Sequence, residues 1–283
     1  MISFKLYREH GALNSGPVFD AFAAGVARTG NCVVTSNEDV AVIWSALWHG
    51  RMLANQQVYN QMRLQNRPVI ILEVGNLIRG TTWRIGINHI NCNGYFGNTN
   101  NLDHNRPAKL GLTLSDNVIR NRSILITGQH ERSLQWQGQP TTQLWIDKLV
   151  RDIRLISDLP IVFRPHPRAS YVSINKLSNV IIDQPKKLNN TYDDYNFNYN
   201  HHCIINFNSG PGVQSVIHGT PVICDISSLA YPVSNQLSEL DNLVIPDRTE
   251  WLTQLCHTEW NISEIASGMP LARLLSELTN QIC

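Results

Sequence analysis

The chain has 283 residues, of which 42% are apolar and 16% charged, and its formal net charge is +1. This composition excludes a disordered, highly charged chain and suffices for two domains of ordinary size. Residues 1–120 carry 11 Lys and Arg against 7 Asp and Glu, whereas residues 121–283 carry 12 against 15. A basic first half is compatible with a polyanionic partner, although so small an imbalance also arises by chance.

Several features predict a cytoplasmic protein without an essential metal. No run of about 18 apolar residues is present, and the N-terminal segment lacks the basic start and cleavage site of a signal peptide. The six cysteines are scattered without a Cys-x-x-Cys pair, as expected for reduced thiols. The cluster His201-His202-Cys203 suggests a metal only weakly, because adjacent residues of a strand point to opposite faces. We therefore expect no metal and no other cofactor.

Short apolar runs rich in β-branched residues alternate with helical patterns, which indicates βαβ units and parallel sheets. The first helix is marked by Ser15 as N-cap and by Pro17 in its first turn. It repeats Val18, Phe22 and Val26 on one face. Further helices are expected at residues 51–66, 141–156 and 212–218, and through most of the chain after residue 250. The predicted strands are residues 2–7, 32–35, 40–44, 69–73, 123–127, 161–164, 180–183, 203–207, 222–224 and 243–245.

A change of composition near residues 121–122 predicts a domain boundary. Residues 86–109 before it are rich in Asn, Gly and His, and a fresh strand opens after it. We therefore expect an α/β protein of two Rossmann-like domains, residues 1–121 and 122–283, with a helical C-terminal tail. Folds of this class bind ligands at the carboxyl ends of their strands, so the predicted active site is a central cleft between the domains.

The first chemical motif directly follows a predicted strand. His166 stands between Pro165 and Pro167, and because proline fixes φ and restricts the preceding residue, the imidazole is held at low entropic cost. Arg164 and Arg168 on either side make the segment cationic, which suits a phosphate leaving group. The alternative is a rigid loop with a surface histidine and two solvated arginines.

The second motif, Asn208-Ser209-Gly210-Pro211-Gly212, joins a strand to a short helix. The glycines let a ligand approach the backbone, and the helix start offers N–H groups to an anion. Ser209 adds a hydroxyl donor. The alternative is a tight strand-to-helix turn, because a glycine-rich loop alone is a weak signal.

The third motif is an apolar strand, residues 69–73, that ends in a carboxylate. Glu73 is followed by Gly75, and a charge at the end of a buried strand is costly unless it is paired or faces a cleft. Facing the second domain, Glu73 could deprotonate an acceptor hydroxyl as general base. The alternative is an ion-paired structural glutamate.

A basic and aromatic segment follows that strand. Its side chains could hold a phosphate backbone or stack on a base or sugar. The predicted acceptor-binding residues are therefore Arg79, Trp83, Arg84 and Asn88. Trp83 could equally belong to the core.

The order of these motifs resembles bacterial GT-B glycosyltransferases of the capsule-polysaccharide and sialyltransferase groups. The motifs are Glu73-Val74-Gly75, then His166-Pro167, then the serine turn before the strand Gly219-Thr220-Pro221-Val222-Ile223. The resemblance implies that Glu73 is the catalytic base and that His166 and Ser209 contact the nucleotide phosphates.

Gly128-Gln129 matches a glycine-glutamine pair of the capsule group, which implies that Gln129 belongs to the donor site. Two positions depart from the pattern. Val74 stands where those families usually have a second acid, and Asn208-Ser209 stands where they have two hydroxyl residues. These departures weaken the transfer of roles to Glu73 and Ser209.

The chain also resembles small phage-encoded glycosyltransferases that modify hydroxymethylated pyrimidines in DNA, through its Asn- and Gly-rich segment 85–94 and its basic first half. The predicted function is therefore transfer of a sugar from a UDP- or CMP-sugar to a hydroxyl, with 5-hydroxymethylpyrimidine in phage DNA, such as hydroxymethylcytosine, as first acceptor. Such an enzyme would act in the cytoplasm of a bacterial or phage-infected cell. The alternatives are a capsule or lipopolysaccharide acceptor, a GT-B-like sugar-nucleotide epimerase, and a non-catalytic nucleic-acid-binding module.

Overall fold

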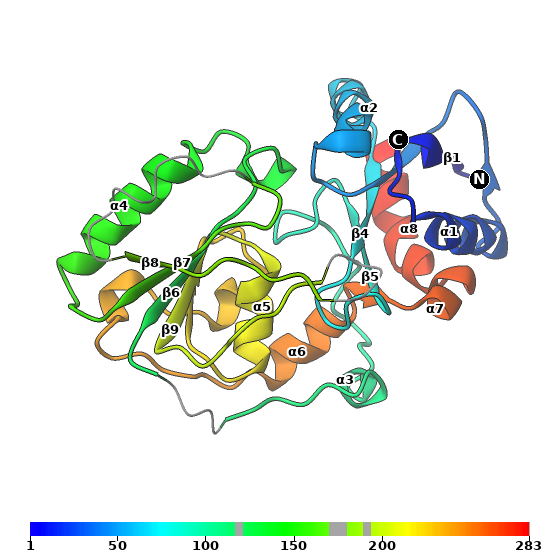
Figure 1. The fold of residues 1–283 in the computed structure, drawn as a ribbon. Helices are drawn as coiled ribbons and strands as arrows, with labels where there is room; N and C mark the ends of the chain where they lie inside the picture. The colour runs from blue at the N-terminus through cyan, green and yellow to red at the C-terminus, as the bar shows by residue number, and fades with distance from the viewer. Residues whose placement is uncertain (117–120, 170–179, 189–193, 283) are drawn as a thin grey trace. The chain divides into compact units, whose positions relative to one another are not determined.

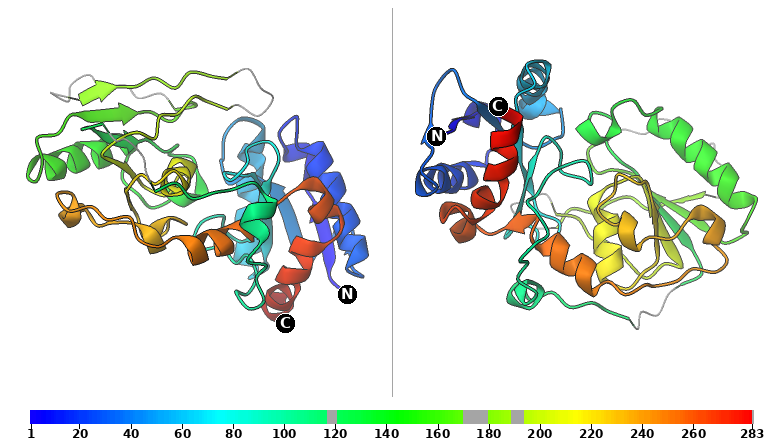
Figure 2. Two further views of the ribbon diagram at one scale, coloured as in Figure 1. Left: turned by 90° about the horizontal axis from the view of Figure 1, so that it is seen from below. Right: turned by 180° about the vertical axis from the view of Figure 1, so that it is seen from behind.

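The computed structural model describes residues 1–116, 121–169, 180–188 and 194–282. The chain forms two compact units, Met1–Leu110 with Thr253–Cys283, and Gly111–Leu252. Each unit contains one sheet (Figures 1 and 2). The predicted α/β class with two Rossmann-like sheets is confirmed.

The first unit is built on a six-stranded mixed sheet in the order β11-β5-β4-β3-β1-β2. The first four strands in the chain pair in parallel, and β5 and β11 pair antiparallel at one edge. The chain passes from β1 to β2 and then returns to the other side of β1, which makes β1 and β3 the switch point of the sheet. The strands are β1 (Ser3–Leu6), β2 (Cys32–Val33), β3 (Val40–Trp44), β4 (Val69–Val74), β5 (Trp83–Ile87) and β11 (Glu259–Trp260).

The helix after β1 agrees with its predicted face. In α1 (Gly16–Arg28) the side chains of Val18, Phe22 and Val26 are buried. Ser15 occupies the N-cap position, but its hydroxyl donates to the carbonyl of Ala12 and makes no bond to the first turn. The helix between β3 and β4 is α2 (Leu53–Leu64).

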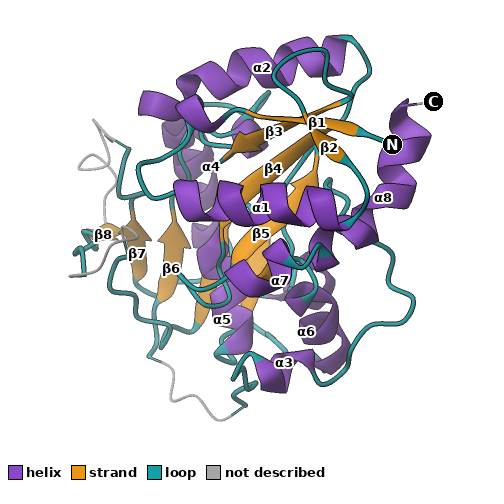
Figure 3. Ribbon diagram, turned by 90° about the vertical axis from the view of Figure 1, so that its right-hand side faces the viewer, coloured by secondary structure: helices purple, strands orange, loops and turns teal. Residues whose placement is uncertain are grey.

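The C-terminal tail belongs to the first unit, in contrast to the predicted second domain of residues 122–283. Helix α7 (Ile262–Ala266) packs on α1, and Figure 3 shows the two side by side. The contact depends on Gly25, because an added Cβ there would overlap the carbonyl oxygen of Ile265. Helix α6 (Thr249–Cys256) begins in the second unit and ends in the first, and α8 (Met269–Ile282) follows α7.

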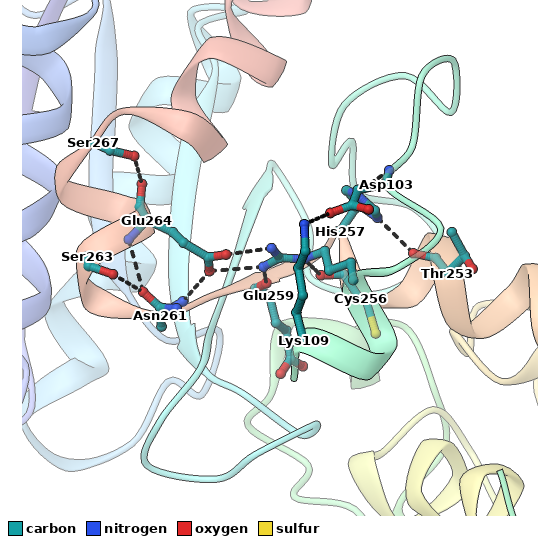
Figure 4. Close-up of polar contacts among 11 residues, drawn as sticks. Asp103, Lys109, Thr253, Cys256, His257, Glu259, Asn261, Ser263, Glu264 and Ser267 are labelled. Atoms are coloured by element: carbon teal, nitrogen blue, oxygen red, sulfur yellow. Dashed lines mark hydrogen bonds and ion pairs between the residues drawn. The ribbon is translucent and has the colours of Figure 1, made fainter. Parts of the chain in front are cut away.

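A buried arginine holds this tail to the segment that carries α3 (Arg106–Lys109), in the region drawn in Figure 4. The Arg106 guanidinium donates to both carboxylate oxygens of Glu264, at 2.5 and 3.0 Å, and to the carbonyls of Cys256 and Glu259. Glu264 also forms a capping box with Asn261 at the start of α7. A charge with this many partners explains why the chain after residue 252 folds with the first unit.

The second unit has a five-stranded, fully parallel sheet in the order β10-β9-β6-β7-β8. The chain runs outward from β6 to β8, then returns to the other side of β6 for β9, so the switch point lies between β6 and β9. Right-handed crossovers then place α4 and α5 on opposite faces (Figures 1 and 2). The elements are β6 (Ile124–Thr127), α4 (Thr142–Arg154), β7 (Ile161–Arg164), β8 (Val180–Ile182), β9 (Cys203–Asn206), α5 (Gly210–Ile217) and β10 (Val222–Cys224).

One hydrophobic core cluster of the second unit lies between α4 and the sheet. Ile146, Val150 and Ile153 of α4 pack against alternate residues of β6, β7 and β9. Short 3-10 helices lie between the elements within each unit. They are Arg8–His10 and Gly50–Met52 in the first unit, and Leu134–Trp136, Tyr231–Val233 and Leu237–Glu239 in the second.

Two sequence predictions about strands are wrong. The apolar run 243–245 is not a strand, because the Asn235 side chain takes the place of a strand partner and bonds to both main-chain groups of Val244. Conversely, β5 occupies residues that the sequence suggested as a ligand-binding segment. Its five residues are all buried, including Trp83 and Arg84.

Candidate functional site

Each unit gathers polar side chains at the carboxyl ends of its parallel strands. In the first unit the Glu73 carboxylate, at the end of β4, lies against Ser45 and Ala46, which follow β3. In the second unit we define the imidazole cluster as His130 and His166, which follow β6 and β7. Both predicted catalytic residues, Glu73 and His166, therefore stand at strand ends.

The carboxylate of Glu73 is fixed by three donors. Oε2 accepts the Ser45 hydroxyl at 2.7 Å and the main-chain N–H of Ala46 at 3.2 Å. Oε1 accepts the main-chain N–H of Val74 at 3.0 Å. The side chain is half-buried, so part of it stays open to a ligand. Ser45 has no signature in the sequence.

Gly75 in the acid-x-Gly motif has a packing role toward a different carboxylate. An added Cβ at Gly75 would overlap Oε2 of Glu259 and the carbonyl of Thr82. Glu259 is completely buried and accepts the Thr82 hydroxyl at 2.9 Å, together with the main-chain N–H groups of Asn76 and Leu77. The close packing of Glu259 and Thr82 therefore accounts for a glycine at position 75 without any ligand.

Three of the four predicted acceptor-binding residues take part in the fold of the first unit. Arg84 is buried and ion-paired with Glu259 at 2.6 Å, and Trp83 is buried beside it in β5. The amide of Asn88 bonds to the start of β4 and to α8. The fourth, Arg79, is exposed to solvent.

The two imidazoles of the imidazole cluster lie edge to face, with ring centroids 5.3 Å apart and an interplanar angle of 89°. In each ring, Nδ1 accepts the main-chain N–H two residues further on, from Arg132 at 3.1 Å and from Arg168 at 3.2 Å. A nitrogen that accepts carries no proton, so in the neutral form of each ring the proton is on Nε2. His130 was not singled out in the sequence, although it directly follows Gln129 at a predicted strand end.

Gln129 bridges the switch point of the second sheet. Its Nε2 donates to Oδ1 of Asn208 at 2.7 Å, and its Oε1 accepts the Asn208 main-chain N–H at 3.3 Å. The Asn208 amide in turn donates to the hydroxyl of Ser227 at 2.8 Å. Gln129 thus fixes the loop after β6 to the loop after β9, beside His130.

The two arginines around His166 have different surroundings. Arg164 is buried and ion-paired with Asp183 at 2.5 Å. Its guanidinium also donates to Asn196 and lies over the ring of Phe197, 5.2 Å from the centroid. Arg168 is exposed. Arg168 is therefore the one of the two whose side chain is open to solvent.

The serine turn is organised by Asn206, the last residue of β9. Its amide donates to the carbonyl of Ser209 at 3.0 Å and to the Ser209 hydroxyl oxygen at 3.3 Å. Because that oxygen accepts, the Ser209 O–H remains a donor. An added Cβ at Gly212 would overlap the Asn206 amide, so this glycine also has a packing role. Gly210 is the first residue of α5.

Two polar atoms at the switch point are buried and have no hydrogen-bond partner within the described ranges. They are Oγ1 of Thr127 and Oδ1 of Asn206, which end β6 and β9 and are paired in register. Buried polar atoms without partners are uncommon in folded proteins. Their position coincides with the edge of the sheet where α/β folds bind ligands.

The residues that the structure describes include neither a metal-binding group nor a helix that could span a membrane. That part of the chain contains no group of three or more His, Cys, Asp and Glu that could hold a metal ion. Within the same ranges, no helix has the length and apolar character needed to cross a membrane.

No protein-family model and no curated protein matches the chain. Among solved structures, the beta Kdo 2,7 transferase KpsC of Thermosulfurimonas dismutans is similar at 14% identity and a TM-score of 0.48, over 97% of this chain and 100% of that chain. The UDP-GlcNAc 2-epimerase of Methanocaldococcus jannaschii is similar at 13% identity and a TM-score of 0.32, over 97% and 99%. The glycosyltransferase SnogD of Streptomyces nogalater is similar at 12% and 0.31, over 97% and 83%. Similarity at this level carries no conclusion about activity.

Proposed function

We propose that the chain is a glycosyltransferase that moves a sugar from a nucleotide-sugar to a hydroxyl acceptor. The observation that carries the proposal is the imidazole cluster beside the switch point of the second sheet. Open α/β sheets bind nucleotides at such points, outside the carboxyl ends of their strands. The two imidazoles follow β6 and β7, and Ser209 and the start of α5 follow β9, so these groups stand at the same edge of the sheet, where their polar groups suit a diphosphate.

On the donor side, we assign His166, His130 and Ser209 to the phosphates, with the N–H groups at the start of α5 and the exposed Arg168 adding positive potential. These donors would stabilise the negative charge that develops on the departing phosphate. Removal of one such donor typically lowers the rate on the order of 10²–10³-fold. Gln129 and Arg164 would act indirectly, by holding the loops that carry the donors.

On the acceptor side, we assign the proton transfer to Glu73. The acceptor oxygen forms a bond to the anomeric carbon as the bond from that carbon to the phosphate oxygen breaks. The electron pair leaves with the phosphate, and the hydroxyl proton passes to the Glu73 carboxylate. The three hydrogen bonds to Glu73 support this role because they orient a carboxylate that is still partly exposed.

For the acceptor, we propose 5-hydroxymethylpyrimidine in DNA as the first candidate and a surface saccharide as the second. The DNA acceptor draws on the basic first half of the sequence and on the exposed Arg79. Trp83 and Arg84 give it no support, because both are buried in β5. A DNA acceptor would make binding strongly dependent on salt, whereas a neutral saccharide would not.

The test is incubation of the protein with labelled UDP- and CMP-sugars, alone and with hydroxymethylated DNA or oligosaccharides. The proposal predicts that label appears on one of these acceptors. Change of configuration of the sugar without an acceptor would identify an epimerase. Absence of any turnover of every nucleotide-sugar, with all acceptors, would overturn the proposed function.

A further inference from the structure

Ser45 has an unusual backbone conformation next to Glu73. Five non-glycine residues of the described part have φ between 55° and 66°: four are asparagines, and the fifth is Ser45 at 66°. Asparagine tolerates the left-handed region, whereas serine rarely enters it. Conformations of this kind persist where the surrounding structure imposes them, and they gather at functional sites.

The surroundings of Ser45 fix both its backbone and its hydroxyl. The residue is 4% exposed, and its main-chain N–H donates to the carbonyl of Leu72 at 2.7 Å. Oγ accepts the main-chain N–H of Leu47 at 3.1 Å, so its own proton is directed to Oε2 of Glu73 at 2.7 Å. The left-handed turn also brings the next N–H, that of Ala46, to the same oxygen at 3.2 Å.

The two oxygens of Glu73 therefore differ. Oε2 receives two donors from the end of β3, which uses both of its acceptor directions. Oε1 receives the N–H of Val74 and, among the described residues, no further protein donor. One acceptor direction of Oε1 remains for a ligand.

We propose that Ser45 is the positioning residue of the acceptor site, fixing Glu73 so that Oε1 receives the proton of the attacking hydroxyl. This inference rests on the proposed function. In the transfer step, the hydroxyl proton goes to Oε1 while the hydroxyl oxygen bonds to the anomeric carbon. Ser45 itself exchanges no proton with the substrate, and it acts through the orientation of the carboxylate.

The first experiment is Ser45→Gly, which removes the hydroxyl at a position whose φ glycine adopts without strain, so the fold is retained. Because a misplacement of about 1 Å costs on the order of 10²-fold in rate, we expect kcat to fall about 10- to 100-fold. The KM for the nucleotide-sugar should change less than about threefold, since Ser45 is assigned to a step after binding. The matched control is Asn37→Gly, at an exposed position with φ 57°, for which we expect unchanged kcat and KM.

The second experiment repeats Ser45→Gly in the Glu73→Gln background. If Ser45 acts through the carboxylate, it should have no further effect on kcat once the carboxylate is gone. Equal losses in both backgrounds, or full activity of Ser45→Gly, would overturn the positioning role while the transferase activity stands. Full activity of Glu73→Gln would remove the base assignment and this inference together. Absence of transfer by the unmodified protein would instead overturn the proposed function.

Discussion

Two carboxylates of the first sheet, Glu73 on β4 and Glu259 on β11, have contrasting environments. Glu259 is completely buried, and its four donors include the Arg84 guanidinium at 2.6 Å. Glu73 is half-buried, and its three donors are neutral. The first environment neutralises the charge within the protein, and the second orients a charge that stays within reach of solvent.

The difference shows why a motif alone does not assign a role. The sequence marks Glu73 by its place at a strand end, but Gly75 in the same motif is required by Glu259, far away in the chain. A buried charge with a full set of partners contributes to the fold, and its removal should affect stability. A partly exposed charge that lacks an ionic partner can be removed with little effect on the fold, and its loss should affect chemistry.

The largest expected effect is on activity, in Glu73→Gln. The substitution keeps the shape of the side chain but removes the base, so we expect kcat to fall by about 10² to 10⁴. The free energy of unfolding, from urea denaturation, should change by less than about 1 kcal/mol. A variant that is inactive because it is unfolded would contradict the contrast with Glu259.

The largest expected effect on stability is in Glu259→Gln. This change leaves the buried guanidinium of Arg84 without its carboxylate, and we expect a loss of about 3–5 kcal/mol in urea denaturation. The matched control is Glu9→Gln, an exposed glutamate, with an expected change within about 0.5 kcal/mol. Equal effects of the two substitutions would show that the buried ion pair has no structural role.

Gly75→Ala tests the packing role of the motif glycine. The added methyl group overlaps the Glu259 carboxylate and the Thr82 carbonyl, and we expect a destabilisation of about 1–3 kcal/mol. Gly16→Ala is the control. An added Cβ there would meet no heavy atom within 4 Å, apart from its chain neighbours and the nearby backbone of its own helix. Normal stability of Gly75→Ala together with lost activity would return the glycine to a ligand-binding role.

The smallest expected effect concerns His257, which is buried near Glu259. Its Nε2 accepts the N–H of Asp103 at 3.2 Å, its Nδ1 donates to the carbonyl of Thr253 at 2.8 Å, and burial lowers its pKa. The folded state therefore disfavours protonation, so this contribution to stability is present above the unfolded pKa of about 6.5 and is lost as the pH falls below it.

Urea denaturation at pH 8 and pH 5 checks this prediction. The loss of stability at pH 5 should be smaller in His257→Gln than in the unmodified protein. Burial also lowers the pKa values of His89, His201 and His218, so part of the acid sensitivity should remain in the variant. An identical loss in both proteins would contradict the role of His257.

The regular parts of the fold were predictable from local pattern. The strands at 40–44 and 161–164 have the predicted bounds because the first is an uninterrupted apolar run and the second is an apolar run that ends in Arg164. Strand β5 was missed because Arg84 interrupts its apolar run, and the partner that makes the arginine tolerable, Glu259, lies far away in the chain. No local pattern contains that pairing.

The candidate site was predictable only in part, for a related reason. Strand-end positions revealed Glu73 and His166, and the same criterion applied to the residue after Gln129 would have found His130. Ser45 could not be found, because its role depends on a left-handed φ and on a contact with the neighbouring strand. The burial of Arg164 likewise depends on Asp183, which follows β8, and on Asn196, which lies in the loop before β9.

The most direct test of the central claim is a titration of UDP and CMP against the unmodified protein and His166→Ala. If the imidazole cluster holds the donor phosphates, one of these nucleotides binds, and its Kd rises at least about tenfold in the variant, as expected for a lost hydrogen bond to a charged group. Equal affinity of both proteins, or binding of neither nucleotide, would contradict the account.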